Sequence, residues 1–158
     1  MFRKMRRFKQ EISNEECIEI LINEKRGVLS VIGDDGYPYG IPINHYYNKD
    51  DNCIYFHGAK EGHKVDAIKR NNKVSFTIFE KGIKRENHWS YDVRSVIVFG
   101  KAYFIEDLEE CKKICSDLWW KFGTDEKELE DEINRALSRV LCIKIEIDHM
   151  TGKKVNES

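Results

Sequence analysis

Apolar and polar residues alternate along much of the chain, which is the pattern of β-strands that turn one face toward a core. This alternation predicts strands over 28–32, through Ile41, Ile43 and Tyr46, and over 53–57, 73–79, 94–105 and 143–148. Helical spacing predicts helices that follow Ser13, Gly62 and Ile105. Short turns between antiparallel strands predict a mainly β fold, a small closed barrel of five or six strands with flanking α-helices.

Several residues mark where these elements begin, turn or bend. Ser13 and Glu16 form a capping box for the first helix, which we expect to end near residues 26–27. Residues 33–36 supply a hairpin turn, and Pro42 marks an edge or a bulge because proline cannot donate to a strand ladder. Gly100 is expected to bend the long strand 94–105. We expect residues 80–90 to form a loop.

Two helices are predicted after Ile105, each with one apolar stripe. The stripes are Leu108, Cys111, Cys115, Leu118 and Phe122 in the first helix, and Leu129, Ile133, Ala136, Leu137 and Val140 in the second. Trp119 and Trp120 are expected to pack in the core or at an interface, with a ligand wall as the alternative.

Length and charge limit the classes of function. The 158 residues fit a single domain, made of an arm (1–12), a barrel with its helices (13–106), a helical pair (107–140) and a final strand with a tail (141–158). The 27 Lys and Arg residues balance 28 Asp and Glu residues, which argues against a nucleic-acid-binding protein. No apolar run is long enough to cross a membrane, and no signal peptide is recognisable. We expect a cytoplasmic protein.

The cysteine pattern is that of reduced thiols. The five cysteines are odd in number and form no Cys-x-x-Cys motif. Cys111 and Cys115 lie one helical turn apart, but no histidine accompanies them at ligand spacing. We expect buried thiols and no metal, with a metal site or a redox pair as the alternative.

The segment 54–68 contains the strongest chemical signal. An apolar strand leads through Gly58 and Gly62 into a helix that begins with His63 and Lys64. Glycine lets a backbone approach an anion, and the N–H groups and dipole of a helix start favour negative charge. The segment predicts a phosphate-binding site for a phosphorylated cofactor, while an ordinary strand-turn-helix connection is the alternative.

Two other phosphate motifs do not match. A nucleoside-triphosphate loop requires four residues between its glycines and a hydroxyl residue after the lysine, but three residues separate Gly58 from Gly62 and Val65 follows Lys64. A dinucleotide fingerprint, Gly-x-Gly-x-x-Gly after a strand, is missing.

Taken together, the motifs resemble the flavin-binding split barrels related to pyridoxamine phosphate oxidase, and among them the 5-nitroimidazole-resistance proteins. The resemblance covers nearly the whole chain and depends on the order and spacing of several segments. These are residues 5–7, 33–39 followed by 42–44, 57–59 with 62–64, 94–100 and 151–153.

The resemblance implies FMN at the interface of a homodimer. It places the phosphate near Gly58, Gly62, His63 and Lys64, and the ring along the strand Pro42, Ile43 and Asn44, above Phe56 and His57. It also implies that Arg94 and Ser95 offer polar groups to the cofactor, from the partner subunit.

The implied chemistry is two-electron reduction of a small nitro-aromatic or quinone-like acceptor. His57 is the candidate for proton handling or substrate orientation, with Tyr91 as a second candidate and a purely structural or flavin-contacting His57 as the alternative. Residues 39–41 lack the arginine that the oxidase branch uses, which argues against a phosphorylated vitamin as substrate. The alternatives are a non-catalytic flavin or haem carrier or sensor, an oxidase-like activity, and a cofactor-free barrel that binds nucleic acid or protein through the basic arm 3–9.

Overall fold

Eight strands form one antiparallel sheet in the computed structural model, which describes residues 1–123, 131, 133–135 and 137–157. The strands are β1 (Arg26–Ile32), β2 (Pro38–Asn44), β3 (Tyr46–Asn48), β4 (Cys53–Ala59), β5 (Lys73–Phe79), β6 (Ile83–Lys84), β7 (Tyr91–Ile105) and β8 (Val140–Glu157). The helices with regular hydrogen bonding are α1 (Asn14–Asn23), α2 (His63–Arg70) and α3 (Leu108–Phe122), and short 3-10 turns occur at Phe8–Gln10 (η1) and Asp34–Gly36 (η2).

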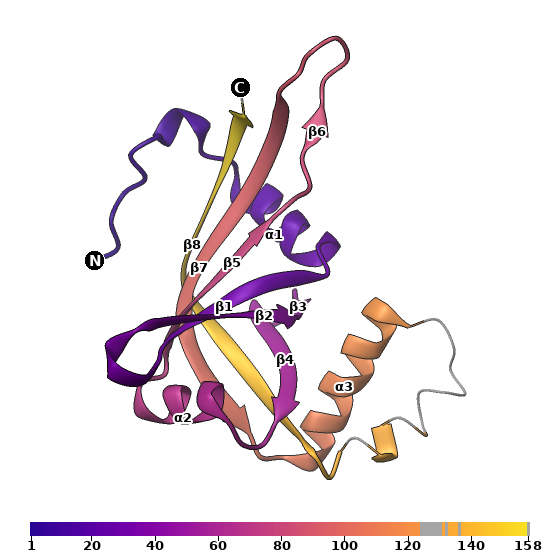
Figure 1. Ribbon diagram of the computed structural model, residues 1–158. Coiled ribbons are helices and arrows are strands. Elements are labelled where there is room, and N and C mark those ends of the chain that lie inside the picture. The colour runs from indigo at the N-terminus through magenta and orange to yellow at the C-terminus, as the bar shows by residue number, and fades with distance from the viewer. Residues whose placement is uncertain (124–130, 132, 136, 158) are drawn as a thin grey trace.

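The sheet curls into a split barrel. Its strand order is β2-β1-β5-β7-β8-β4-β3, with β6 paired to β7 (Figure 1). The two end strands of this order, β2 and β3, are consecutive in the chain and are separated by His45 alone, so the sheet turns back toward its own beginning. The mainly β fold with flanking helices is confirmed. The barrel is not closed as predicted, because no pairing among the described residues joins the end strands β2 and β3.

The predicted number of strands was too low. The alternation predicted one strand where the structure has β2 and β3, and it predicted no strand within the loop 80–90, where β6 lies. His45 separates β2 from β3 because its ring turns inward, where it is 0% exposed and its Nε2 lies 2.7 Å from the Leu21 carbonyl oxygen at the end of α1.

The first helix begins where its local sequence pattern predicted. The backbone N–H of Glu16 donates to Ser13 Oγ at 3.2 Å, and the Ser13 N–H donates to Glu16 Oε2 at 3.0 Å, so the capping box is confirmed. α1 ends at Asn23, three residues before the predicted end, and β1 begins at Arg26. Gly27 lies in that strand and packs closely on the Phe76 ring, since a Cβ at this position would lie 2.5 Å from it.

A long ribbon of β7 and β8 connects the two halves of the barrel. The register shifts between Phe99 and Gly100, opposite an extra residue in β8, and the predicted bend of β7 at Gly100 stays a prediction. β8 is much longer than the predicted strand 143–148 and pairs with β7 from Cys142 to Glu157. Val140 begins this strand and does not end a helix as predicted. Of the second predicted helix, Leu129 and Ala136 lie outside the described residues.

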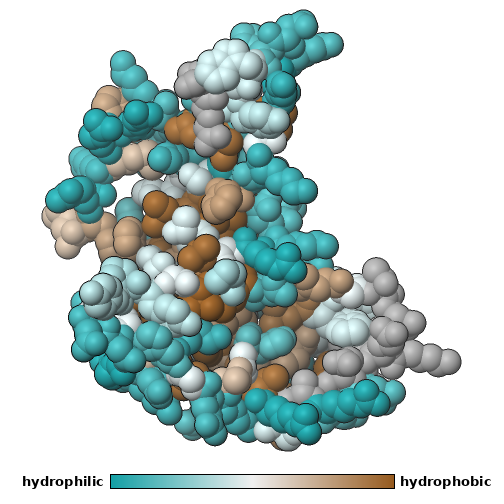
Figure 2. All heavy atoms as spheres, in the orientation of Figure 1, coloured by the Kyte–Doolittle hydropathy of each residue, from teal (hydrophilic) through white to brown (hydrophobic). Residues whose placement is uncertain are grey.

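The sheet separates two apolar clusters. One fills the barrel and includes Leu29, Phe56, Phe76, Ile143 and Ile145. The other lies between α3 and the opposite face of β4 and β8, and contains Cys53, Tyr55, Cys111, Ile114, Cys115, Leu118, Ile133 and Cys142. Figure 2 shows hydrophobic residues gathered over the middle of one face, with hydrophilic residues around them. None of the helices in the described part of the chain is long and apolar enough to span a membrane.

Candidate cofactor site

A cavity of about 470 Å³ lies where the edge strand β2, the end of β4, the start of α2 and the helix α3 meet. This volume falls within the usual range for small-molecule sites. The lining residues are Ile41, Pro42, Ile43, Asn44, His57, Lys64, Cys115, Leu118, Trp119 and Phe122. The fold therefore brings five of the predicted cofactor-binding residues, from three separate segments, to one cavity.

The β2 wall presents an open strand edge. β2 ends the strand order and pairs with β1 alone among the described strands, so its second edge has no strand partner there. Pro42 faces Val28 without a register shift, so it marks an edge and not a bulge. The Asn44 side chain is oriented by Arg26, whose Nε donates to Asn44 Oδ1 at 2.7 Å. Free backbone groups along this edge can pair with a planar polar ligand.

The turn between β4 and α2, which we call the cradle, contains the predicted phosphate-binding site. Gly62 precedes α2 with φ of +122° and ψ of 171°, a conformation that is almost restricted to glycine. No side chain caps the helix, so its first N–H groups remain available to an anion. A Cβ on Gly58 would lie 2.7 Å from Lys64 Nζ, so the missing side chain makes room for the lysine to cross β4.

Lys64 is a half-buried cation at the base of the cavity. Its Nζ lies 5.6 Å from the centre of the Phe56 ring, which is 0% exposed beneath it. Burial lowers the pKa of Lys64 below its ordinary value. Among the described residues no carboxylate forms an ion pair with it, so an anionic ligand would supply the missing counter-charge.

His57 faces the same cavity from the end of β4. Burial, and then the positive charge of Lys64, lower the pKa of His57. This shift favours the neutral imidazole, in which one nitrogen donates and the other accepts a hydrogen bond. It can orient a polar ligand or exchange a proton with it.

His63 begins α2 but is not among the residues that line the cavity. Its ring stacks on Tyr39 with centroids 4.2 Å apart, and its Nε2 accepts a hydrogen bond from the Asp34 N–H at 3.1 Å. His63 thus fixes the start of α2 to the turn before β2. Its predicted contact with a phosphate stays a prediction.

Arg94, Ser95 and Tyr91 do not line the cavity of this chain. The Arg94 guanidinium forms ion pairs with Glu80 at 2.5 Å and Glu19 at 3.2 Å. Their predicted roles, which depend on a partner subunit for Arg94 and Ser95, stay predictions.

The sequence did not identify the α3 wall. Cys115, Leu118, Trp119 and Phe122 line the cavity, although their spacing indicated only burial. Trp119 carried the one usable signal, because a ligand wall was the alternative considered for it. Trp120 is 51% exposed and lies outside this lining.

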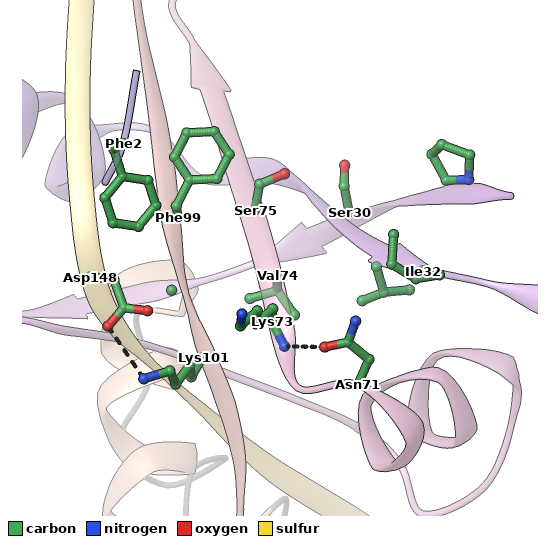
Figure 3. Close-up of a pocket in the computed structure, with 13 residues that line it drawn as sticks. Phe2, Ser30, Ile32, Asn71, Lys73, Val74, Ser75, Phe99, Lys101 and Asp148 are labelled. Carbon is green, nitrogen blue, oxygen red and sulfur yellow. Dashed lines mark hydrogen bonds and ion pairs between the residues drawn. The ribbon is translucent and has the colours of Figure 1, made fainter. Parts of the chain in front are cut away.

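A larger cavity, of about 730 Å³, lies elsewhere on the molecule (Figure 3). Phe2, Ser30, Ser75 and Phe99 belong to its lining, which includes none of the predicted cofactor-binding residues. It also lacks the glycine-flanked helix start, and its Lys101 already pairs with Asp148 at 3.9 Å. We therefore assign the cofactor to the smaller cavity.

The cysteines of the described chain are unbridged and buried, as predicted. Among the residues that the structure describes, no group of three or more His, Cys, Asp or Glu side chains is arranged to hold a metal ion.

The model of the family described as pyridoxamine 5'-phosphate oxidase matches residues 13–154, and the chain therefore belongs to this family. The comparison with curated proteins finds no match.

Solved structures with the same fold cover almost the whole chain. A candidate 5-nitroimidazole antibiotic resistance protein from Bacteroides thetaiotaomicron is 28% identical, with a TM-score of 0.79 over 93% of this chain and 87% of that chain. A FAD-binding protein from Mesorhizobium loti is 22% identical, with a TM-score of 0.69 over 92% and 97%. The flavocytochrome Anf3 from Azotobacter vinelandii is 19% identical, with a TM-score of 0.68 over 96% and 72%. The split-barrel fold predicted from the motifs is thus confirmed.

Proposed function

We propose that this protein is a flavin-dependent oxidoreductase that binds FMN in the cavity between β2, β4, α2 and α3. The observation that carries the proposal is the half-buried, unpaired Lys64 beside an uncapped helix start, opposite an open strand edge. The similarity to flavin-binding proteins and to a candidate 5-nitroimidazole resistance protein supports it.

The chain's own residues would divide the work of binding. Lys64 and the first N–H groups of α2 would hold the phosphate, with Gly58 and Gly62 providing room and backbone geometry. The edge of Pro42, Ile43 and Asn44 would pair with the polar rim of the ring system. FMN has both an anionic tail and a planar polar head, so it matches both walls.

When bound, FMN would supply the two-electron redox chemistry of this reaction. His57 would orient a small nitro-aromatic or quinone-like acceptor and supply a proton to it. A phosphorylated vitamin substrate is not favoured, because Tyr39 stacks on His63 and residues 39–41 offer no cation. The buried unbridged thiols fit a cytoplasmic location.

A homodimer is part of the proposal. β5 and β7 expose the large apolar side chains Phe79, Ile97 and Phe99 on one face, while the alternating residues are buried. Contiguous exposed apolar surface of this kind marks interaction sites. A second copy that covers this face would bring its own residues to the cofactor cavity, as the family resemblance implies.

The dimer is tested by its mass in solution. Ile97→Lys places a charge on the apolar face and should convert the dimer to a monomer in light scattering after gel filtration. Leu108→Lys is the matched control, because Leu108 is 61% exposed on α3 and lies away from that face. A monomeric wild type, or a dimer that tolerates Ile97→Lys, would rule out this interface.

The catalytic function is tested first by the absorption spectrum of the purified protein with added FMN. Dithionite should then reduce the bound flavin under anaerobic conditions, and an added 5-nitroimidazole should reoxidise it faster than it reoxidises free reduced FMN. His57→Ala should slow this reoxidation while leaving FMN bound. A protein that does not bind FMN would refute the proposal.

A carrier or sensor is the second candidate function. Similar solved structures include the flavocytochrome named above and a FAD- and haem-binding protein from Mycobacterium smegmatis. A carrier would bind flavin or haem tightly, yet its reoxidation rate would equal that of the free cofactor. The spectrum of the bound cofactor distinguishes flavin from haem in the same experiment.

A further inference from the structure

Two cysteines meet beneath the wall of the cofactor cavity. Cys115 on α3 and Cys142 on β8 bring their sulfur atoms to 3.9 Å, although 27 positions separate them in the sequence. Cys115 is 8% exposed and lines the cavity, whereas Cys142 is 0% exposed behind it. A small solute in the cavity can therefore contact Cys115, whereas Cys142 is buried in the core.

The other thiols of this cluster are engaged differently. The Cys111 S–H donates to the Ile105 carbonyl oxygen at 3.3 Å, and the Cys53 S–H donates to the Asp51 carbonyl oxygen at the same distance. Within the described chain, Cys115 and Cys142 are the pair whose sulfur atoms contact each other.

The surroundings distinguish the roles of the two sulfurs. The Cys142 sulfur lies 3.9 Å from Cys115 Sγ, and it also lies 3.7 Å from the Cys111 carbonyl oxygen. A hydrogen bond between the two sulfurs lowers the pKa of Cys115 and raises that of Cys142, and of the two thiols Cys115 is the one that lines the cavity. Lys64 adds positive charge to the same cavity. A thiolate is the reactive form of cysteine, so Cys115 is the sulfur that should react first.

We propose that Cys115 and Cys142 form a redox-active thiol pair that reduces small hydroperoxides and closes to a disulfide between α3 and β8. The reaction requires no flavin, although Cys115 lines the cavity that the proposed function assigns to FMN. The pair differs from Cys111 and Cys115, the two thiols for which the sequence left a metal site or a redox pair open.

The chemistry balances with two thiols and one hydroperoxide. The Cys115 thiolate attacks the terminal peroxide oxygen, the O–O bond breaks, and a sulfenic acid forms while water or an alcohol leaves. The Cys142 sulfur then attacks the Cys115 sulfur, the S–O bond breaks, and water leaves with the thiol proton. Two electrons pass from the thiols to the peroxide, and an external dithiol resets the pair.

The required movement is small. A disulfide has sulfur atoms about 2 Å apart, so side-chain rotation must shorten the present contact by roughly 2 Å. The product would tie α3, and with it the wall formed by Leu118 and Trp119, to the strand beneath.

The sequence makes the test direct, because trypsin places each cysteine in a separate peptide. Cys115 falls in peptide 114–121, Cys142 in 140–144 and Cys111 in 102–112. Reduced full-length protein is treated in the dark with one equivalent of hydrogen peroxide or tert-butyl hydroperoxide and analysed by mass spectrometry without reduction. We expect peptides 114–121 and 140–144 to be linked, and a dithiol to reverse the link.

Three variants separate the steps. Cys115→Ser should abolish the link and slow peroxide consumption about tenfold or more. Cys142→Ser should leave a sulfenic acid on Cys115 that dimedone traps, which keeps the proposal testable if the first variant folds poorly. Cys53→Ser is the control from the same cluster and should form the link as the wild type does.

The contrary outcomes are equally specific. A link between peptides 102–112 and 114–121, oxidation of Cys17 or Cys53 as fast as Cys115, or wild-type protein that forms no link would each overturn the proposal.

Discussion

Lys64 and Arg94 are both partly buried cations that the sequence placed at the cofactor, yet their surroundings differ. Arg94 is 22% exposed and lies among Glu80, Glu19 and Glu16, and its hydrogen bond with Glu80 raises its pKa. Burial lowers the pKa of Lys64, and no carboxylate of the described residues pairs with it. The difference teaches that a cation already matched by carboxylates holds the fold, whereas one left unmatched in a cavity awaits a ligand.

The largest expected effect is the loss of stability when Arg94 is removed. Arg94→Ala leaves Glu80 partly buried without its partner and should lower the free energy of unfolding by about 2 kcal/mol, as measured by urea unfolding. Arg85→Ala, which removes a more exposed cation from its ion pair with Asp92, should cost less than Arg94→Ala. Weakened FMN binding with unchanged stability would instead support the cofactor role that the resemblance implies for Arg94.

The corresponding substitution of Lys64 should weaken FMN binding. Lys64→Ala removes a charge-assisted hydrogen bond to the phosphate and should weaken FMN binding by about 1 to 3 kcal/mol, measured by fluorescence titration. The free energy of unfolding without FMN should not fall. Lys60→Ala, an exposed lysine of the same turn, is the control, and an unchanged dissociation constant in Lys64→Ala would remove the assignment.

The two cations should also differ in their response to alkaline pH. The phosphate binds the protonated Lys64, and burial has lowered the pKa of this group in the free protein. FMN affinity is therefore full below that pKa and falls as pH rises through it, by at most about tenfold per pH unit. Titrations from neutral pH upward should show this loss in the wild type and not in Lys64→Ala. Equal slopes for the two proteins would assign the titration to another group.

The smallest expected effect concerns Gly58. A Cβ there would lie 2.7 Å from Lys64 Nζ, which ends a flexible side chain and can move at little cost to folding. Gly58→Ala should therefore weaken FMN binding by about 1 kcal/mol or less. In the Lys64→Ala background the same change should have no further effect, and additive losses in this cycle would show that Gly58 acts independently of Lys64.

The sequence predicted best those features that neighbouring residues determine. The helix start at Gly62, the strand Lys73–Phe79 and the capping box at Ser13 all depend on contacts within a few positions, and all three agree with the structure. The positive φ of Gly62 was not predicted and is a finding of the structure.

Features that depend on distant contacts were not predictable. The ion pairs of Arg94 join positions far apart in the chain, so no local pattern distinguishes it from a ligand-binding arginine. The stripe of α3 showed that Cys115 and Leu118 are buried, but not that they border the cavity. The strand β8 was predicted to end at Asp148 because its two-residue alternation is interrupted there.

The interruption at Asp148 has a geometric origin with a practical consequence. Phe99 faces His149 and Gly100 faces Ile147, so Asp148 is a supernumerary residue in the ladder. Before Asp148 in the sequence, the odd-numbered residues Ile143 and Ile145 are buried in the barrel. After Asp148, the even-numbered Gly152 is buried. Removing Asp148 would keep each half of β8 in its present phase and would eliminate the register shift, together with the ion pair between Asp148 and Lys101. A single deletion at this position would therefore bring β7 and β8 into an unshifted register without exchanging buried residues for exposed ones.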